Sequence, residues 1–592
     1  YTEFRVGYQG VGAYLSSTDQ IFETTPALLL LERRWFEVLG RLERGELPKL
    51  TIRYARQERE GGKDATIWGE DSATSSGRGV VPSIYNLDEV RNTIEVTSSK
   101  SFEATTVELG YRYDEIKTGN DLLISRAPDE VANTRKITEQ KGSRSEISTV
   151  KGFLGYRFND TIRLTTGASL VALDRKSEGN RVYGDAFYAP YDVLAGVRQM
   201  GDTGFRELSG ESDMDQLLIH ANVALNPSPA LTFIVSGRLE KISKSGSSSF
   251  YETDLTTHPI TFQQVGGEAI IVGSAADDFD EVTMRWELRY TGFKHLSLFL
   301  RATAYYGSGS IEEVAQRTKG YVIPSDVSGS TLIDWVDRKN DYEREGRKMA
   351  TGFSWYVRRD LTLSGQYRWE VRENSYEPIY TYKKLFERLK YPNYISEHDW
   401  VLHRGFVRLK WVPRAGLSFN THIDAEMRDL KTQSIDQPSV ESGQMDSVTL
   451  GESFTCALSS KVSLQAFVSY TQFKLKTPAS GITGNAAGVV NASNGGYVYG
   501  SLNVMYSFND QNQLELSYSM LDSDDYVDNS NISVPYGNRL KENVVSIVYR
   551  RTVSEAVKWN IGFTFHSSKD DASNGYYDFE AQEIFMGLSK GF

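Results

Sequence analysis

The sequence predicts an all-β protein, a single closed antiparallel transmembrane β-barrel of about 22 strands, within a range of about 20 to 26. We expect short periplasmic turns, long extracellular loops and no plug domain. Three observations lead to this fold class: stretches in which apolar and polar residues alternate, tight turns that alternate with long polar connections, and a repeat of roughly 45 to 70 residues.

The stretch "VTMRWELRY", residues 282–290, shows the alternation most clearly. Its even positions carry apolar side chains and its odd positions carry polar or charged ones. Because a β-strand turns successive side chains to opposite faces, this pattern gives one apolar wall and one charged wall. After the turn "TGFKH", residues 296–304 repeat the pattern. A strand of a soluble β-sandwich can alternate in the same way, so one hairpin does not decide the fold.

Ten such hairpins follow one another along the chain. Their centres fall near residues 46, 100, 160, 228, 293, 360, 414, 460, 511 and 554. Polar connections rich in Gly, Asp and Ser, such as residues 58–89 and 521–531, join one hairpin to the next. Tight turns at one end of the strands and long loops at the other are typical of outer-membrane barrels, whereas a sandwich does not require this asymmetry.

One strand before the hairpins, near residues 4–8, and one after them bring the total to about 22. The last strand ends on Phe592, which resembles the carboxy-terminal aromatic signal that outer-membrane barrels present to their assembly machinery. Aromatic residues near strand ends, such as Trp286, Trp411 and Trp559, predict girdles at the membrane interfaces.

Composition excludes several classes of protein. The formal net charge of -12 argues against a nucleic-acid partner, and no apolar run approaches the roughly 20 residues of a spanning helix. The single cysteine, Cys456, rules out a disulfide within the chain. The seven histidines lack ligand spacing and no short nucleophile motif occurs, so we predict no metal ligands, no catalytic residues and no enzyme activity.

We expect residues 1–592 to form a single outer-membrane β-barrel domain. No linker or change of composition divides the chain. No signal peptide is visible at Tyr1, which fits a mature chain of the bacterial outer membrane whose signal peptide has been removed.

The alternation assigns side chains to the two sides of the wall. Those expected to face the lumen, and to contact a partner or solute there, are Arg285, Glu287, Arg289, Arg301, Arg368, Arg404, Arg408, Lys410, His422 and Asp424. Those expected to face outer-membrane lipid are Val282, Met284, Trp286, Leu288, Leu298, Leu300, Val407 and Leu409. Any water-filled barrel needs charges on its inner side, so a lumenal position alone does not identify a partner.

A wide barrel with long loops and without a plug resembles the MtrB/PioB family of decahaem-associated outer-membrane proteins, as do the stretches "GFLGYRFNDTIRLTTGASL" and "EAQEIFMGLSKGF". The resemblance implies a sheath around a periplasmic multihaem c-type cytochrome, which forms a transmembrane conduit for extracellular electron transfer. An extracellular multihaem cytochrome would be a second partner. Haem is expected only in these partners, because the chain lacks Cys-x-x-Cys-His for covalent attachment. It also lacks the Cys-x-x-Cys that some members carry near the mature amino terminus.

Two other functions remain open from the residues alone. One is a wide diffusive porin or solute channel gated by its long loops, and the other is a structural or adhesion scaffold that presents those loops. The excess of arginine among the predicted lumenal residues suits an acidic protein partner and an anionic solute equally.

Overall fold

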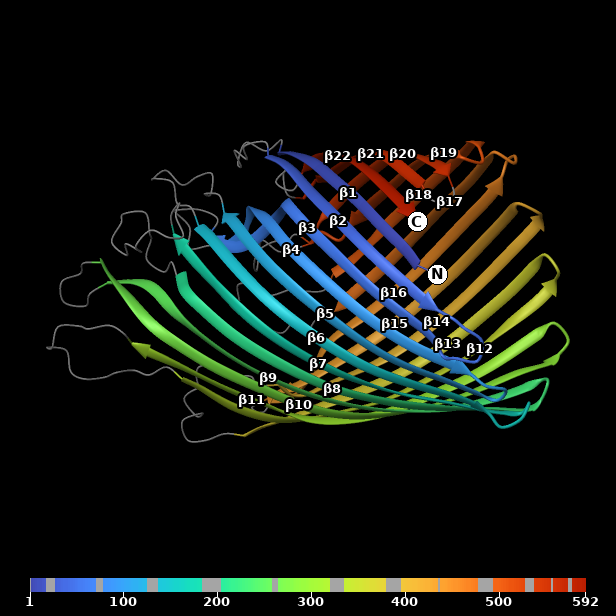
Figure 1. The fold of residues 1–592 in the computed structure, drawn as a ribbon, viewed down its shortest axis with the longest axis horizontal. Helices are drawn as coiled ribbons and strands as arrows, with labels where there is room; N and C mark the ends of the chain where they lie inside the picture. Colours follow the sequence, from blue (N-terminus) through green and yellow to red (C-terminus); the bar gives the residue numbers. More distant parts are fainter. Residues whose placement is uncertain are drawn as a thin grey trace.

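The computed structural model describes most of the chain, and every regular element in the described part is a β-strand (Figure 1). The described residues are 2–17, 27–70, 78–124, 137–183, 204–257, 264–319, 335–379, 395–434, 437–476, 493–527, 537–554, 557–572 and 578–591. No helix in these ranges has the length and apolar character that crossing a membrane would require.

The strands are long, and each pairs with its neighbours in the sequence. Their bounds are β1 (Thr2–Ser17), β2 (Ala27–Leu42), β3 (Lys49–Glu70), β4 (Arg78–Ser101), β5 (Thr105–Ile124), β6 (Ile137–Arg157), β7 (Ile162–Tyr183), β8 (Gly204–Ser228), β9 (Leu231–Thr257), β10 (Gln264–Phe293), β11 (Leu296–Lys319), β12 (Trp335–Arg358), β13 (Leu361–Ile379), β14 (Ile395–Arg414), β15 (Leu417–Ser434), β16 (Gln437–Ala457), β17 (Val462–Lys476), β18 (Ser493–Asn509), β19 (Asn512–Asp524), β20 (Arg539–Ser554), β21 (Val557–Asp570) and β22 (Phe579–Gly591). The prediction of an all-β chain with about 22 antiparallel strands is confirmed.

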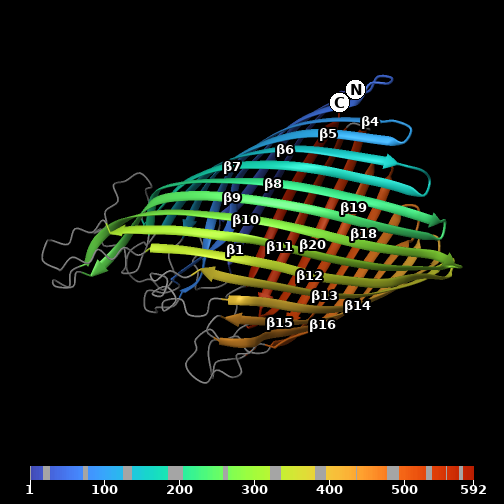
Figure 2. The same ribbon diagram turned by 90° about the horizontal axis from the view of Figure 1, so that it is seen from below.

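The first strand pairs with the last as well as with the second. The β1–β22 ladder runs from Arg5↔Gly591 to Ser17↔Phe579, and the β1–β2 ladder covers the other edge of β1. The series of strand pairs therefore returns to its starting strand. Figures 1 and 2 show strands on opposite sides of the molecule crossing at an angle, with both termini close together.

Short turns join the strands at one end of the sheet, on the right in Figure 1. They follow β2, β4, β6, β8, β10, β12, β14, β16 and β18, and β20 and β21 pair up to Ser554↔Val557, on either side of two residues outside the described ranges. Each predicted hairpin centre lies between the two strands of such a pair or within two residues of that connection. The turn between β14 and β15 uses Gly416 at φ +76, a left-handed conformation in which a side chain is strained. Turn chemistry and alternation together locate the hairpins.

The prediction of a long loop at residues 58–89 is wrong for most of these residues. Strand β3 continues to Glu70 and β4 begins at Arg78, with a ladder that extends from the turn to Glu70↔Arg78. A strand that has left the membrane has water on its outer face, so it needs no apolar alternation to remain paired. The polar composition of this segment therefore marks the end of the apolar band and not the end of the strand.

The register gives the sheet one apolar face and one polar face. On β10 the apolar face carries Val282, Met284, Trp286 and Leu288, whose exposed fractions are 37 to 49%. The next two positions on this face, Asp278 and Asp280, are carboxylates. A membrane crossing needs about 9–11 strand residues, whereas β10 has 30. The apolar band thus covers only the part of β10 nearest the turn.

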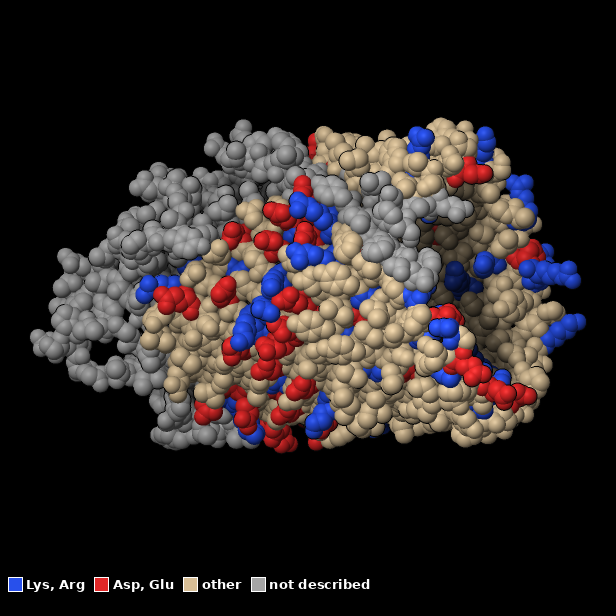
Figure 3. Space-filling model, in the orientation of Figure 1, with Lys and Arg blue, Asp and Glu red and all other residues tan. Residues whose placement is uncertain are grey.

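The surface of the molecule shows the same division (Figure 3). Charged side chains gather toward the strand ends away from the short turns, next to a largely uncharged area, and Lys and Arg side chains with some Asp and Glu line the edge on the turn side. Aromatic pairs lie on the apolar face close to the turns: Tyr156–Phe158, Tyr290–Phe293, Trp411–Phe419, Phe419–Phe454, Tyr506–Phe508 and Tyr549–Trp559. This arrangement is typical of an interfacial girdle.

We expect arginine on the apolar face to destabilise the fold strongly. Leu288 and Leu300 are cross-strand partners on this face, and replacing either with arginine should lower the free energy of unfolding by about 1–3 kcal/mol, between the costs expected at the middle of the membrane and at its interface. Ser297→Arg, on the polar face of β11, should cost much less. Denaturant titration of the protein in lipid vesicles measures both, and equal losses on the two faces would contradict this assignment of faces.

Candidate functional site

Charged side chains form a row across neighbouring strands of the polar face. Consecutive cross-strand partners connect Glu287 of β10 to Arg301 of β11, then through Ala350 of β12 to Arg368 of β13 and Arg404 of β14. Facing residues of an antiparallel pair lie on the same side of the sheet. The register therefore gathers on one surface residues that are more than a hundred positions apart in the sequence.

Glu287 is the centre of the first cluster in this row. Its side chain is only 4% exposed, and its carboxylate accepts hydrogen bonds from Arg285 at 2.7 Å, Arg289 at 2.5 Å and Arg301 at 3.0 Å. Arg285 and Arg289 flank Glu287 on β10, because residues two positions apart on a strand point to the same side. One buried carboxylate thus holds three half-exposed guanidinium groups, which leaves an excess of positive charge.

Glu370 of β13 repeats this arrangement. Its side chain is 2% exposed, and it forms ion pairs with Lys348 at 2.8 Å and with Arg368. Lys348 is its cross-strand partner, and Arg368 lies two residues before it on the same strand. A buried charge is tolerated only where paired and hydrogen-bonded, so both cations are needed to hold this carboxylate in the wall.

The cations of β14 extend the cluster. Arg404 Nε donates to both carboxylate oxygens of Asp424, at 2.8 and 3.0 Å. Arg408 donates to the amide oxygen of Asn420, and Lys410 is exposed. Within the described ranges, Arg408 and Lys410 form no ion pair with a carboxylate. Their charge therefore adds to the excess on this face.

The ten residues expected to face the lumen all lie on the polar face in the register, and those expected to face lipid all lie on the apolar face. Val407 pairs with Gly365, and Leu409 pairs with Leu363, so both are opposite in orientation to Arg404 and Arg408. Seven of the eight apolar residues are exposed large side chains, and Leu298 is half-buried. Phe592, the expected assembly signal, lies outside the described residues.

Sequence reasoning missed other buried carboxylates of the polar face. Asp114 accepts hydrogen bonds from Arg91, Arg112 and Thr93, and Glu139 pairs with Lys141 and Arg181. The sequence does contain a signal for them, since each carboxylate has a cation two residues away on the same strand. The pattern Arg-x-Asp at 112–114 and Glu-x-Lys at 139–141 matches Arg-x-Glu at 285–287.

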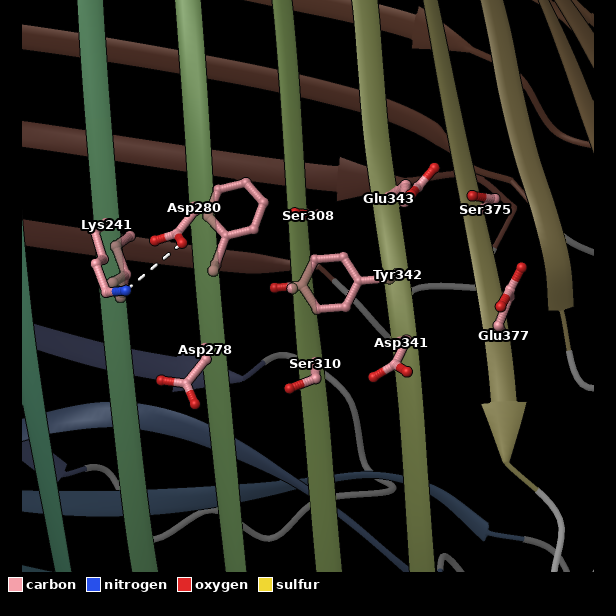
Figure 4. A pocket seen from close by; sticks show the side chains of 13 residues that line it. Lys241, Asp278, Asp280, Ser308, Ser310, Asp341, Tyr342, Glu343, Ser375 and Glu377 are labelled. Atoms are coloured by element: carbon pink, nitrogen blue, oxygen red, sulfur yellow. Dashed lines mark ion pairs between the residues drawn. The ribbon is translucent and has the colours of Figure 1, made fainter.

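A separate depression of about 400 Å³ lies on the other side of the wall, beyond the apolar band (Figure 4). It is rich in acidic side chains, among them Asp278, Asp280, Asp341 and Glu377, and Lys241 forms an ion pair with Asp280 at 3.6 Å. The described residues contain no group of His, Cys, Asp and Glu side chains arranged to hold a metal ion. Because it lies on the opposite side of the wall and is lined by carboxylates, this depression is distinct from the cationic cluster.

Comparison with known proteins places the fold among large outer-membrane uptake receptors. No protein-family model and no curated protein sequence matches the chain. Among solved structures, the ferric yersiniabactin uptake receptor FyuA from Yersinia pestis has a TM-score of 0.54 at 8% identity, over 100% of this chain and 80% of that one. The ferric citrate transporter FecA has a TM-score of 0.53 at 10% identity, over 100% and 78% of the two chains. The copper transporter OprC has 0.53 at 9%, over 99% and 80%.

These matches correct the resemblance drawn from the sequence. The structural neighbours are uptake receptors and transporters and not MtrB/PioB porin–cytochrome sheaths, and no family model or sequence match supports the latter. The electron-conduit function and the periplasmic and extracellular cytochrome partners are wrong for the same reason, and the diffusive-porin alternative is not supported. Alternation and turn asymmetry are common to outer-membrane barrels of different functions, so they cannot distinguish a sheath from a receptor.

The localisation follows from the fold. The chain shares its fold with outer-membrane receptors over nearly its whole length and has an exposed apolar band, so the predicted bacterial outer-membrane localisation is confirmed. Those neighbours are transport receptors and not enzymes, in agreement with the prediction that this chain is not an enzyme.

We expect Glu287→Gln to destabilise the protein by about 1–3 kcal/mol, because it removes charge-assisted hydrogen bonds and leaves three guanidinium groups close together without their counter-ion. The matched control is Glu345→Gln, which breaks a half-exposed pair with Arg347 at 3.3 Å and should cost about 0–1 kcal/mol. Denaturant titration in vesicles measures both losses. If Glu287→Gln costs no more than the control, its carboxylate does not organise the cluster.

Proposed function

We propose that the chain is the membrane barrel of an outer-membrane receptor that takes up a bulky anionic ligand, such as a metal chelate. The observation that carries this proposal is the excess of positive charge on the polar face. The carboxylates of Glu287, Glu370 and Asp424 together bind six cations, and Arg408 and Lys410 add two more.

In this proposal the series of strand pairs forms a closed barrel, and residues 1–592 form one domain. The apolar face would contact lipid and the polar face would line the lumen. The short turns would lie in the periplasm, and the longer connections would face the outside of the cell. Barrels of about 22 strands are wide enough to hold more than a small solute.

The charge of the clusters on β10 to β14 is opposite to that of the chain as a whole. The formal net charge of the chain is -12, whereas the polar face of β10 to β14 carries more cations than carboxylates. A surface of one sign inside a low-dielectric wall focuses the electric field and draws in ligands of the other sign. Exposed guanidinium groups can also bind carboxylates or other oxyanions by paired hydrogen bonds.

The structural neighbours support this class of ligand. Two of the three receptors described above are named for ferric chelates and the third for copper. Their low sequence identity means that ligand identity does not transfer, and the charge of the wall is the independent reason to expect an anion.

Uptake of radiolabelled ferric citrate by the bacterium that encodes the chain tests the proposal. We expect uptake that saturates at low ligand concentration, is lost on deletion of the gene, and falls about tenfold when Arg289 and Arg301 are both replaced by glutamine. Arg347→Gln, a more exposed arginine on the opposite face, serves as the matched control and should leave uptake unchanged.

Two outcomes would contradict the proposal. One is uptake that rises in proportion to concentration, as through a diffusive pore. The other is saturable uptake of a neutral chelate that proceeds as fast as uptake of the anion and does not depend on Arg289 and Arg301.

A further inference from the structure

Four ring-bearing side chains form a continuous strip on the polar face, beside the cations of β14. Phe406 of β14 lies 6.2 Å from His422 of β15 between ring centroids, His422 lies 6.2 Å from Phe467 of β17, and Phe467 lies 6.0 Å from Tyr499 of β18. The planes of His422 and Phe467 are within 7° of parallel. All four side chains are half-buried, so part of each ring is open. We call these four residues the ring strip.

A glycine makes the strip continuous. Gly451 of β16 is the cross-strand partner of His422, and a Cβ at this position would overlap with the imidazole ring. Because Gly451 has no side chain, His422 can lean across β16 and reach Phe467 on the next strand. The other rings that cover glycines on this face, such as Phe299 over Gly352, can be explained by packing alone.

Cations border the strip on β14. Arg404 and Arg408 stand two residues on either side of Phe406, and Arg408 is the cross-strand partner of His422. Arg408 is bonded to the neutral Asn420 and not to a carboxylate. A second run of rings, Phe279, Tyr342 and Tyr376, differs in this respect, because the Tyr342 hydroxyl donates to Asp277 at 2.9 Å.

The geometry points to a binding site in the wall for an anion that carries a planar aromatic ring. The ligand ring would pack against Phe406, Phe467 and Tyr499, since aromatic rings attract one another in offset or edge-to-face arrangements. Its anionic group would bind Arg408, with Lys410 supplying further charge. This inference rests on the proposed function, because it names the class of ligand that the receptor takes up.

The test measures binding of 2-naphthoate to the purified full chain in lipid nanodiscs by calorimetry. We expect Phe467→Leu combined with Tyr499→Leu to weaken binding about tenfold, because leucine keeps the apolar volume and removes the ring. The single variant Phe467→Tyr, which keeps an aromatic ring at this position, should retain most of the affinity for 2-naphthoate. Cyclohexanecarboxylate, which has the charge without the aromatic ring, should bind the unmodified protein about tenfold more weakly.

The charge requirement is tested separately. Arg408→Gln should weaken binding of 2-naphthoate and leave binding of the neutral 2-naphthalenemethanol unchanged, and added salt should reproduce this difference. Phe153→Leu provides the matched control, since Phe153 is an exposed ring on the polar face of β6, remote along the sheet from β14 to β18. Heat-modified migration on gels confirms that each variant is folded.

Three results would overturn the inference: binding that survives loss of both Phe467 and Tyr499 rings, an equal loss in Phe153→Leu, or equal affinity for the acid and the alcohol. Failure of the proposed function is distinct from these. If ferric citrate uptake does not depend on the chain while 2-naphthoate still binds at the ring strip, the binding site stands and the transport proposal fails.

Discussion

Every backbone N–H and C=O group within a membrane must find its hydrogen-bond partner inside the protein, because lipid offers none. The pairing of β1 with β22 meets this requirement, since it leaves no strand of the 22 with only one neighbour. Because each strand pairs with two others, the orientation of the side chains on one strand also depends on the register of its neighbours. A slip of one residue in any strand would turn its charged side chains to the apolar face, so alternation and register must agree around the whole sheet.

The charged clusters stabilise carboxylates that are buried in the polar face of the wall. The polar face needs side chains that remain stable when half-buried, and a lone carboxylate there would be costly. Glu287 and Glu370 are each held by two or three cations that come from their own strand and from the adjacent one. Those cations are only partly buried. The groups that stabilise the wall thus also give its surface a positive potential, and structure and proposed function share the same residues.

The sequence was sufficient for the strands, the turns and the separation into two faces, because each depends on neighbouring residues. It was insufficient where the explanation depends on distant strands. Residues 58–89 have a polar composition that suggests a loop, yet most of them belong to β3 and β4, which pair beyond the apolar band. The ring strip was missed for a related reason: no local pattern connects His422 to Phe467, and only the register across Gly451 brings the two rings together. The family resemblance failed because it relied on architecture that unrelated functions share.

Charged side chains of the polar face are arranged in two ways, as chains of alternating ion pairs and as clusters around one carboxylate. On β2 to β6, Arg53 lies between Glu37 at 2.8 Å and Glu95 at 3.6 Å, and Lys151 lies between Glu95 at 3.9 Å and Glu108 at 3.6 Å. That chain of ion pairs begins and ends on a carboxylate. Asp114 of β5, which is held by Arg91 and Arg112, and Glu287 and Glu370 of β10 and β13 show the reverse order, with a carboxylate at the centre and cations around it. The clusters of β10 to β13 differ from that of Asp114 in position, because they lie beside β14, the strand on which the ring strip begins at Phe406.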